Sequence, residues 1–283
     1  MTPLRRKMID AMQLRGFSVR THRSYLEAVN RLAHYYHRSP DQLTGAELQA
    51  FFLYLAKDCG LSGATCRLYL NAIRFLYRQV LERDSFGVTL VVPKRAQRIP
   101  ELLTRTEVGW ILSACRNFKH RMLLTTCYGC GLRVSEVVAL KVRDVDGERH
   151  LLRVEQGKGA KDRHVIVTQT LLTALRFYWR AVRPTRWLFP GREYSTPLSV
   201  VSAQRAFSAA KRRAGIDKIG GIHALRHAYA THQLEAGMPV HQLQRLLGHQ
   251  NIHSTLRYVH WIPDYREGKN GADLIAGLEV GHG

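Results

Sequence analysis

The stretch LLGHQNIHSTLRYVH, residues 246–260, carries a single tyrosine among leucine and valine side chains. Tyr258 has two interpretations in this setting. An aromatic ring between Leu256 and Val259 usually packs in a core, whereas a tyrosine close to cationic side chains can act as a nucleophile. The stretch taken alone favours packing, so the rest of the chain has to decide between the two.

The composition indicates a folded protein that binds a polyanion. The chain has 283 residues, is 45% hydrophobic and carries a formal net charge of +21. This length is sufficient for two domains, each with its own core. Like charges repel one another in a compact state, so the excess of positive charge is better explained by a binding role than by folding. A basic protein gains affinity for DNA because it releases the counterions of the phosphates. An RNA-binding protein or a membrane-surface protein would also be basic.

Hydropathy and cysteine usage bear on the compartment. The first residues, MTPLRRKMIDAMQLRG, contain no apolar segment typical of a secretory signal, and no apolar run of about eighteen residues predicts a membrane span. The odd number of cysteines, 5, favours free thiols in a reducing cytoplasm, where a DNA-binding protein would associate with the nucleoid. Cys127 and Cys130 form a CxxC without a second ligand pair, so we expect no metal there. We also expect no cofactor.

Residues 1–83 have the periodicity of helices. Thr44 followed by Glu47 predicts a capping box at a helix start, and Ser62 is placed to cap the next helix. In SYLEAVNRLAHYY the apolar side chains share one helix face; they are Leu26, Val29, Leu32, Ala33 and Tyr36. The pattern predicts a basic four-helix unit that is suited to hold a DNA backbone.

Residues 84–100 lose the helical period and contain Pro93 and Pro100 among basic side chains, which predicts a stiff linker between two domains. Candidate DNA contacts lie in this linker, in the preceding helix and in a later lysine-rich turn. Each of them also fits an ordinary solvated charge. They are Arg67, Arg74, Arg78, Lys94, Arg95 and Lys161.

Helical periodicity returns after Pro100, with Thr104 and Glu107 spaced as a second capping box. LLRVEQ and RHVIVTQ are β-like runs on either side of GKGAKD, which predicts a hairpin. The second half of the chain is therefore expected to be rich in helices with a small antiparallel sheet. An isolated apolar patch, ADLIAGLEV, lies in the final segment, residues 264–283.

Five short motifs in the second half carry candidate catalytic side chains. GLRVSE places an arginine beside a glycine turn, QGKGAKDR places lysines on the hairpin turn, and HALRHAYATH places a histidine and an arginine on one helix face. LLGH places a histidine directly after a glycine, and STLRYVH contains the tyrosine. Each motif alone also fits a surface charge, a turn or a packed ring. The candidates are Arg133, Lys158, His223, Arg226, His249 and Tyr258.

In this order the motifs resemble those of the tyrosine recombinases, the phage-integrase superfamily, and they are most similar to its bacterial Xer-like branch. That family carries Arg, Lys, His-x-x-Arg, His and Tyr along its catalytic domain. The motif position favours Lys158 over Lys161 as the catalytic lysine. Tyr229 departs from the pattern, because the family often has phenylalanine there. Under this resemblance Tyr258 is the nucleophile.

The resemblance implies a mostly α-helical fold with a small antiparallel β-sheet. Residues 1–83 look like the family's four-helix, SAM-like core-binding domain, joined by the basic linker 84–100 to an α+β catalytic domain, residues 101–263. In this family the C-terminal segment packs on a neighbouring protomer, which gives residues 264–283 an expected role. A disordered tail is the alternative.

The resemblance also implies a site-specific DNA recombinase that needs neither metal nor ATP. It would bind double-stranded DNA at inverted-repeat half-sites, assemble as a homotetramer and exchange strands through a Holliday junction. The reaction would serve integration, excision or resolution, and a mobile-element origin fits the family. Whether an accessory DNA-bending protein or a second recombinase takes part is left open.

The candidate side chains suit this chemistry. Two guanidinium groups, Arg133 and Arg226, can bind the non-bridging oxygens of a phosphodiester and stabilise the charge that develops there. Ionising a phenol with a pKa of ~10 costs about 4 kcal/mol at pH 7, so a base is needed, and His223 is the candidate. Lys158 can protonate the leaving 5′-oxygen, and His249 can donate a hydrogen bond to the phosphate. The intermediate would be a 3′-phosphotyrosyl enzyme.

Other DNA enzymes fit less well. Two-metal nucleases need clustered carboxylates, which the scattered 22 Asp and Glu do not provide, and no GxxxxGK[ST] loop predicts an ATP-driven motor. Two alternatives stay open. A type IB topoisomerase shares the chemistry, and a catalytically silent, sequence-specific DNA-binding regulator shares the fold.

Overall fold

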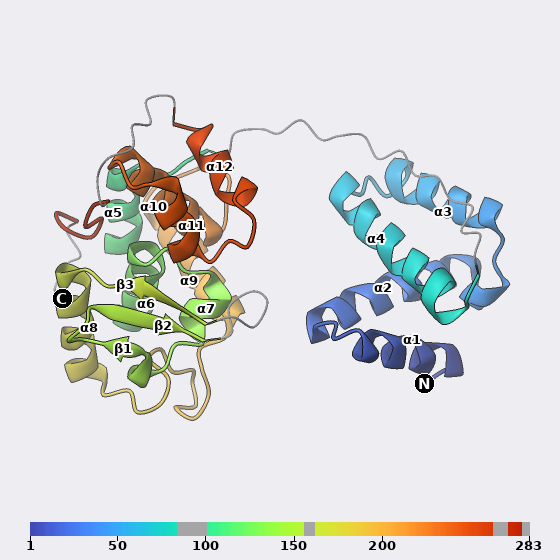
Figure 1. Cartoon of the computed structure of the whole chain (residues 1–283), viewed down its shortest axis with the longest axis horizontal. Coiled ribbons are helices and arrows are strands. Elements are labelled where there is room, and N and C mark those ends of the chain that lie inside the picture. Colours follow the sequence, from blue (N-terminus) through green and yellow to red (C-terminus); the bar gives the residue numbers. More distant parts are fainter. Residues whose placement is uncertain (84–100, 156–161, 263–270, 279–283) are drawn as a thin grey trace. The chain divides into compact units, whose positions relative to one another are not determined.

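The computed structural model describes residues 1–83, 101–155, 162–262 and 271–278 (Figure 1). The chain divides into two units, Met1–Arg98 and Ile99–Gly283. The expected linker, with the candidate DNA contacts Lys94 and Arg95, lies outside the described residues. Among the residues that are described, no helix is long and apolar enough to cross a bilayer.

Within residues 1–83, four α-helices form the N-terminal unit, and a hydroxyl side chain caps the start of each one. Thr44 accepts from the backbone N–H of Glu47 while the Glu47 carboxylate accepts from that of Thr44, so the predicted capping box is confirmed. Ser62 caps the fourth helix, also as predicted. The elements are α1 (Pro3–Leu14), α2 (Val19–Tyr36), η1 (Pro40–Gln42), α3 (Gly45–Lys57), α4 (Gly63–Phe75) and the π-helical turn η2 (Leu76–Val80).

One apolar core joins these helices, with Leu32, Phe51 and Ile73 fully buried at its centre. Polar faces remain outside. Of the three arginines proposed to meet DNA from this unit, Arg67 and Arg78 are exposed. Arg74 on α4 is half-buried. For all three residues, contact with DNA stays a prediction.

A three-stranded antiparallel sheet and a group of helices form the C-terminal unit (Figure 1). The strands are β1 (Val145–Asp146), β2 (Leu151–Val154) and β3 (Arg163–Ile166). The hairpin predicted from LLRVEQ and RHVIVTQ is confirmed, with Leu152 paired to Val165 and both buried. Its turn lies outside the described residues, and with it both candidate lysines, Lys158 and Lys161.

The helix α6 (Phe118–Gly129) is the central element of this unit and is buried along nearly its whole second half. Its two adjacent threonines are satisfied within the helix, because Thr125 and Thr126 donate to the carbonyls of Arg121 and Met122. In the described part of the chain, five helices pack against it. They are α5 (Arg105–Ser113), α7 (Val134–Val138), α8 (Gln169–Val182), α9 (Val200–Arg213) and α10 (His223–Glu235). The short helix η3 (Val142–Asp144) precedes the sheet, and α11 (Val240–Leu247) and α12 (His253–Val259) pack against α10.

The described part of the C-terminal tail, residues 271–278, packs against its own unit. Leu274 and Ile275 are buried in the core. The side-chain amide of Gln233 donates to the backbone carbonyl of Ala272 and accepts from its backbone N–H, both at 2.8 Å. The apolar patch seen in the sequence therefore covers the molecule's own helices in the single chain. A contact with a neighbouring protomer stays a prediction.

A glycine turn carries the chain from α6 to α7. Gly131 has φ +60°, and a Cβ at this position would overlap the ring of Tyr229 on α10. The turn therefore requires glycine twice, for its backbone conformation and for the close approach of α10. It places the next segment, which begins at Leu132, directly beside α10.

Replacing Gly131 with alanine is expected to destabilise the C-terminal unit by about 2 kcal/mol or more, because backbone strain of roughly 1 kcal/mol is joined by the overlap with Tyr229. Gly215 is the matched control: it has φ +68°, and a Cβ added there would meet no atom within 4 Å. Urea unfolding of full-length Gly131→Ala and Gly215→Ala measures the loss in the free energy of unfolding for each variant. Equal losses for Gly131→Ala and Gly215→Ala would show that the packing against Tyr229 is unimportant.

Candidate active site

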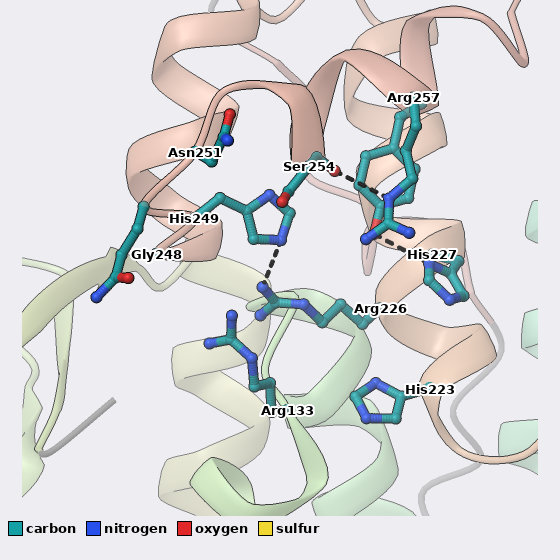
Figure 2. A pocket seen from close by; sticks show the side chains of 11 residues that line it. Arg133, His223, Arg226, His227, Gly248, His249, Asn251, Ser254 and Arg257 are labelled. Atoms are coloured by element: carbon teal, nitrogen blue, oxygen red, sulfur yellow. Dashed lines mark hydrogen bonds between the residues drawn. The ribbon is translucent and has the colours of Figure 1, made fainter. Parts of the chain in front are cut away.

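A cavity of about 320 Å³ lies where α10, α11 and α12 meet the start of α7 (Figure 2). Five of the six candidate catalytic residues line it, and Lys158 lies outside the described residues. The fold thus gathers side chains that are spread over more than a hundred positions of the chain. The lining residues are Arg133, His223, Arg226, His227, Gly248, His249, Gln250, Asn251, Ser254, Arg257 and Tyr258.

Arg226 is held by three hydrogen bonds within the described part of the protein. Its side chain is buried and donates to the carbonyls of Gly131 and Leu247, both at 2.7 Å, and to Nε2 of His249 at 3.1 Å. Burial and the charge of Arg133 lower its pKa to about 10, so Arg226 remains cationic at pH 7. It ties the glycine turn before α7 to the end of α11.

A buried carboxylate, Glu136, organises the arginines. It accepts a bidentate pair from Arg163 at 2.9 and 2.8 Å, and it also accepts from the side chain of Arg133 at 2.7 Å and from the backbone N–H of Arg133 at 2.8 Å. Arg226 lies 3.9 Å away. Burial opposes ionisation, but the hydrogen bonds and charge of Arg163 and Arg133 outweigh it and lower the pKa of Glu136 to about 2.

Arg163, the first residue of β3, links the hairpin to the loop that bears His249. Its Nε donates to the carbonyl of Leu246 at 2.9 Å. Gly248 lies against it with φ +63°, and a Cβ there would come within 2.8 Å of Arg163 Cδ. The glycine of the LLGH motif thus ends α11 in a left-handed conformation and makes room for this arginine.

His249 uses both ring nitrogens within the protein. Burial, then Arg226 and Arg133, lower its pKa to about 3, so the ring is neutral at pH 7. Because a guanidinium only donates, Nε2 accepts from Arg226, and Nδ1–H donates to Thr255 Oγ1 at 2.8 Å. For His249 to donate to a phosphate from Nε2, that nitrogen must gain a proton and leave Arg226.

Tyr258 is 1% exposed, and its ring packs edge-on against Trp261 and parallel to His249. Its Oη lies 3.0 Å from Nδ1 of His227 on α10. Burial raises its pKa, against the charges of Arg226 and Arg257, so the phenol is protonated at pH 7. The two interpretations of Tyr258 are therefore compatible, since the ring is packed and its hydroxyl reaches the cavity.

Sequence reasoning missed Glu136, Arg163 and His227. Glu136 follows Arg133 by three positions, which is the spacing of a capping box, and His227 follows His223 by four on the same helix. These spacings were available as signals. The sequence assigned the acceptance of the phenolic proton to His223, whereas the hydrogen bond to Tyr258 comes from His227.

The sequence profile of the phage integrase family matches residues 101–263, and that of the family's N-terminal SAM-like domain matches residues 4–85. The chain belongs to the phage integrase family. The expected superfamily and the mostly helical, two-part fold are confirmed, and so is the expectation of a tyrosine-type site-specific recombinase, with the regulator and topoisomerase alternatives not favoured.

Relatives and solved structures agree with this assignment. A putative integrase/recombinase of Sinorhizobium fredii is 41% identical over 260 residues, which cover 92% of this chain and 84% of that protein. The tyrosine recombinase XerA of Thermococcus onnurineus is 34% identical over 94% of both chains. A crystal structure of a XerA recombinase has 25% identity, a TM-score of 0.53 and coverage of 91% and 92%. A XerH recombinase bound to a palindromic difH substrate shares the fold, with a TM-score of 0.72 at 20% identity, covering 89% of this chain and 80% of that one.

Glu136→Gln is expected to destabilise the protein by about 3 kcal/mol at pH 7, since it leaves buried guanidinium groups without their counter-charge. The folded pKa of about 2 lies below the ordinary 4.5, so the charge stabilises the fold above pH 4.5 and this contribution is lost as the pH falls toward 2. The free energy of unfolding, measured between pH 2 and pH 4.5, should therefore depend less on pH in Glu136→Gln than in the wild type. Glu155→Gln is the control, because it removes a more exposed carboxylate, the partner of Lys141, and it should change stability much less. Equal effects would contradict the central role of Glu136.

Proposed function

We propose that this chain cuts and rejoins DNA strands at a specific site, with Tyr258 as the nucleophile and a 3′-phosphotyrosyl enzyme as the intermediate. The observation that carries the proposal is the shared cavity, which Tyr258 lines together with Arg133 and Arg226 while its hydroxyl pairs with the neutral ring of His227. The net charge of +21 supports a polyanionic substrate.

The geometry supports a division of roles. Arg133 and Arg226 would bind the non-bridging oxygens of the scissile phosphate, because both reach the cavity and Glu136 fixes the first of them. Both guanidinium groups are cationic before the reaction begins, so they can stabilise the negative charge that develops on the phosphate. His249 would contact the phosphate after releasing Arg226.

The leaving 5′-oxygen needs a proton, and Lys158 is the proposed donor, with Lys161 as the alternative on the same turn. Arg163, the first residue of β3, contacts Glu136 and the carbonyl of Leu246, which supports a role in this site for the segment that precedes it in the chain. The phosphotyrosyl bond is chemically similar to the phosphodiester that it replaces. The strand can therefore be resealed by attack of a 5′-hydroxyl without ATP.

For the DNA partner we propose a duplex with inverted-repeat half-sites, bound by a homotetramer that resolves a Holliday junction. Solved structures of similar fold support DNA as the partner and a multimeric complex: one is a lambda integrase dimer bound to a core site, and another is a Tn1549 transposon integrase with circular intermediate DNA. The second also fits a mobile-element role in integration, excision or resolution. In the N-terminal unit, Arg67 and Arg78 are the exposed candidates for phosphate contacts.

The test is covalent trapping. Purified protein is mixed with a fragment library of host and flanking DNA and quenched in SDS, and protein-linked DNA is recovered and sequenced. Wild type and Tyr128→Phe, which removes another buried tyrosine hydroxyl, should form adducts at one inverted-repeat site. Tyr258→Phe should form none while binding the same site with unchanged affinity.

Two results would overturn parts of the proposal. Adducts that persist in Tyr258→Phe would exclude this nucleophile, and binding without adducts in wild type, even with host extract, would favour a regulator. Exchange of strands between two labelled sites separates a recombinase from a topoisomerase, which reseals only the strand that it cut.

A further inference from the structure

Tyr258 and His227 form a direct pair at the reacting atom. The Tyr258 Oη lies 3.0 Å from His227 Nδ1, a distance at which a proton can pass between them. The pair joins α12 to α10, and Trp261 packs edge-on against both rings. Figure 2 shows the His227 ring on the same helix as Arg226, one position further along the chain.

His223, the proton acceptor suggested by the motif pattern, is placed differently. It begins α10 and is more exposed than His227, and the centroids of these two rings are 6.4 Å apart. Both histidines face the cavity. The hydrogen bond to the nucleophile is nevertheless made by His227, and geometry is the first requirement for a general base.

We propose that His227 accepts the phenolic proton of Tyr258 during strand cleavage, an inference that rests on the proposed function. The O–H bond of Tyr258 breaks and its proton moves to Nδ1 of His227. The phenolic oxygen bonds to phosphorus, the bond from phosphorus to the 5′-oxygen breaks, and that oxygen takes a proton from Lys158. Resealing reverses each step, so His227 returns the proton to the departing Tyr258.

The surroundings of His227 keep it ready to accept. Burial lowers its pKa to about 4, with His223, Arg257 and Arg226 adding to the effect, so the ring is neutral at pH 7. These groups, together with Tyr258, are the titratable and charged side chains that face it from α10 and α12. A bound phosphodiester is negative and offsets the repulsion from the two arginines. His227 should therefore bind a proton more readily in the DNA complex than in the free protein.

The chain contains a matched control on the same helix. His232, five positions after His227, also pairs its Nδ1 with a buried tyrosine, Tyr128, at 2.9 Å, and burial also lowers its pKa to about 4. It does not line the cavity. His227→Asn and His232→Asn remove the same chemistry from the two pairs, since an asparagine amide occupies the position of Nδ1 without accepting a proton at ordinary pH.

The experiment measures single-turnover cleavage of the site recovered by trapping, on two substrates. One has the natural 5′-oxygen at the scissile phosphate and the other has a bridging 5′-sulfur, which leaves as a thiolate and needs no proton. We expect His227→Asn to slow cleavage of both substrates by about 10²–10⁴-fold. Lys158→Ala should be slow only on the oxygen substrate, and His232→Asn should cleave both at the wild-type rate.

The pH profile gives a second readout. On the sulfur substrate the wild-type rate should fall as the pH drops through the pKa of His227 in the DNA complex, because the protonated ring cannot accept. This decrease should be absent in His227→Asn. If that variant does not fold, as judged by DNA affinity and thermal melting, His227→Ala supplies the test, and added imidazole should restore its cleavage in proportion to the free base.

Four results would contradict the role proposed for His227 or the function on which it rests. A His227→Asn rate within a few-fold of wild type would reduce His227 to a positioning residue and overturn the proposal, as would normal sulfur-substrate cleavage by that variant. If only His223→Asn lost cleavage activity, His223 would be the proton acceptor. If Tyr258→Phe also forms adducts, the proposed function itself fails, which is a different result from any of these.

Discussion

The buried carboxylate of Glu136 is the interaction on which the site depends. Three guanidinium groups, those of Arg133, Arg163 and Arg226, lie within 4.0 Å of it. Without a counter-charge such groups would repel one another strongly in a poorly solvated setting. One carboxylate among three cations lets them approach and still leaves the cavity positive, which is the condition for capturing a phosphate.

The same cluster holds together segments that are distant in sequence. Arg133 comes from the turn after α6, Arg163 from the hairpin, and Arg226 from α10, and the last two also bind carbonyls at the end of α11. Two glycines make this approach possible, because side chains there would meet Tyr229 or Arg163. The site is therefore a junction between elements. A phosphate that enters it competes with internal contacts, among them the bond from Arg226 to His249.

Burial sets the protonation states of the histidines and the tyrosine. Around His227 and His249, exclusion of water and nearby arginines favour the neutral rings. The Tyr258 hydroxyl is held protonated by the same loss of water. The site thus holds the proposed nucleophile, Tyr258, in its neutral form beside the neutral ring of His227, its proposed proton acceptor. The negative charge of a bound phosphodiester would change the protonation equilibria of both groups.

The sequence by itself determined the features that depend on near neighbours. The capping boxes at Thr44 and Thr104, the hairpin strands and the glycine break between α6 and α7 could be predicted because each is fixed within a few residues. The order of the motifs also identified the family, and five candidate residues do line one cavity. Their combination into one site came from the resemblance, since no local rule brings Arg133 to Tyr258.

Only the tertiary structure decided which side chains touch. It paired Tyr258 with His227 and not with His223, made Arg163 the link between hairpin and loop, and placed Leu274 and Ile275 in the core of their own unit. Helix periodicity gives the face on which a residue lies, but the partner of that face depends on how helices pack. The physical reason is that hydrogen bonds at 3 Å and core contacts join residues whose separation in the chain carries no information about their distance in space.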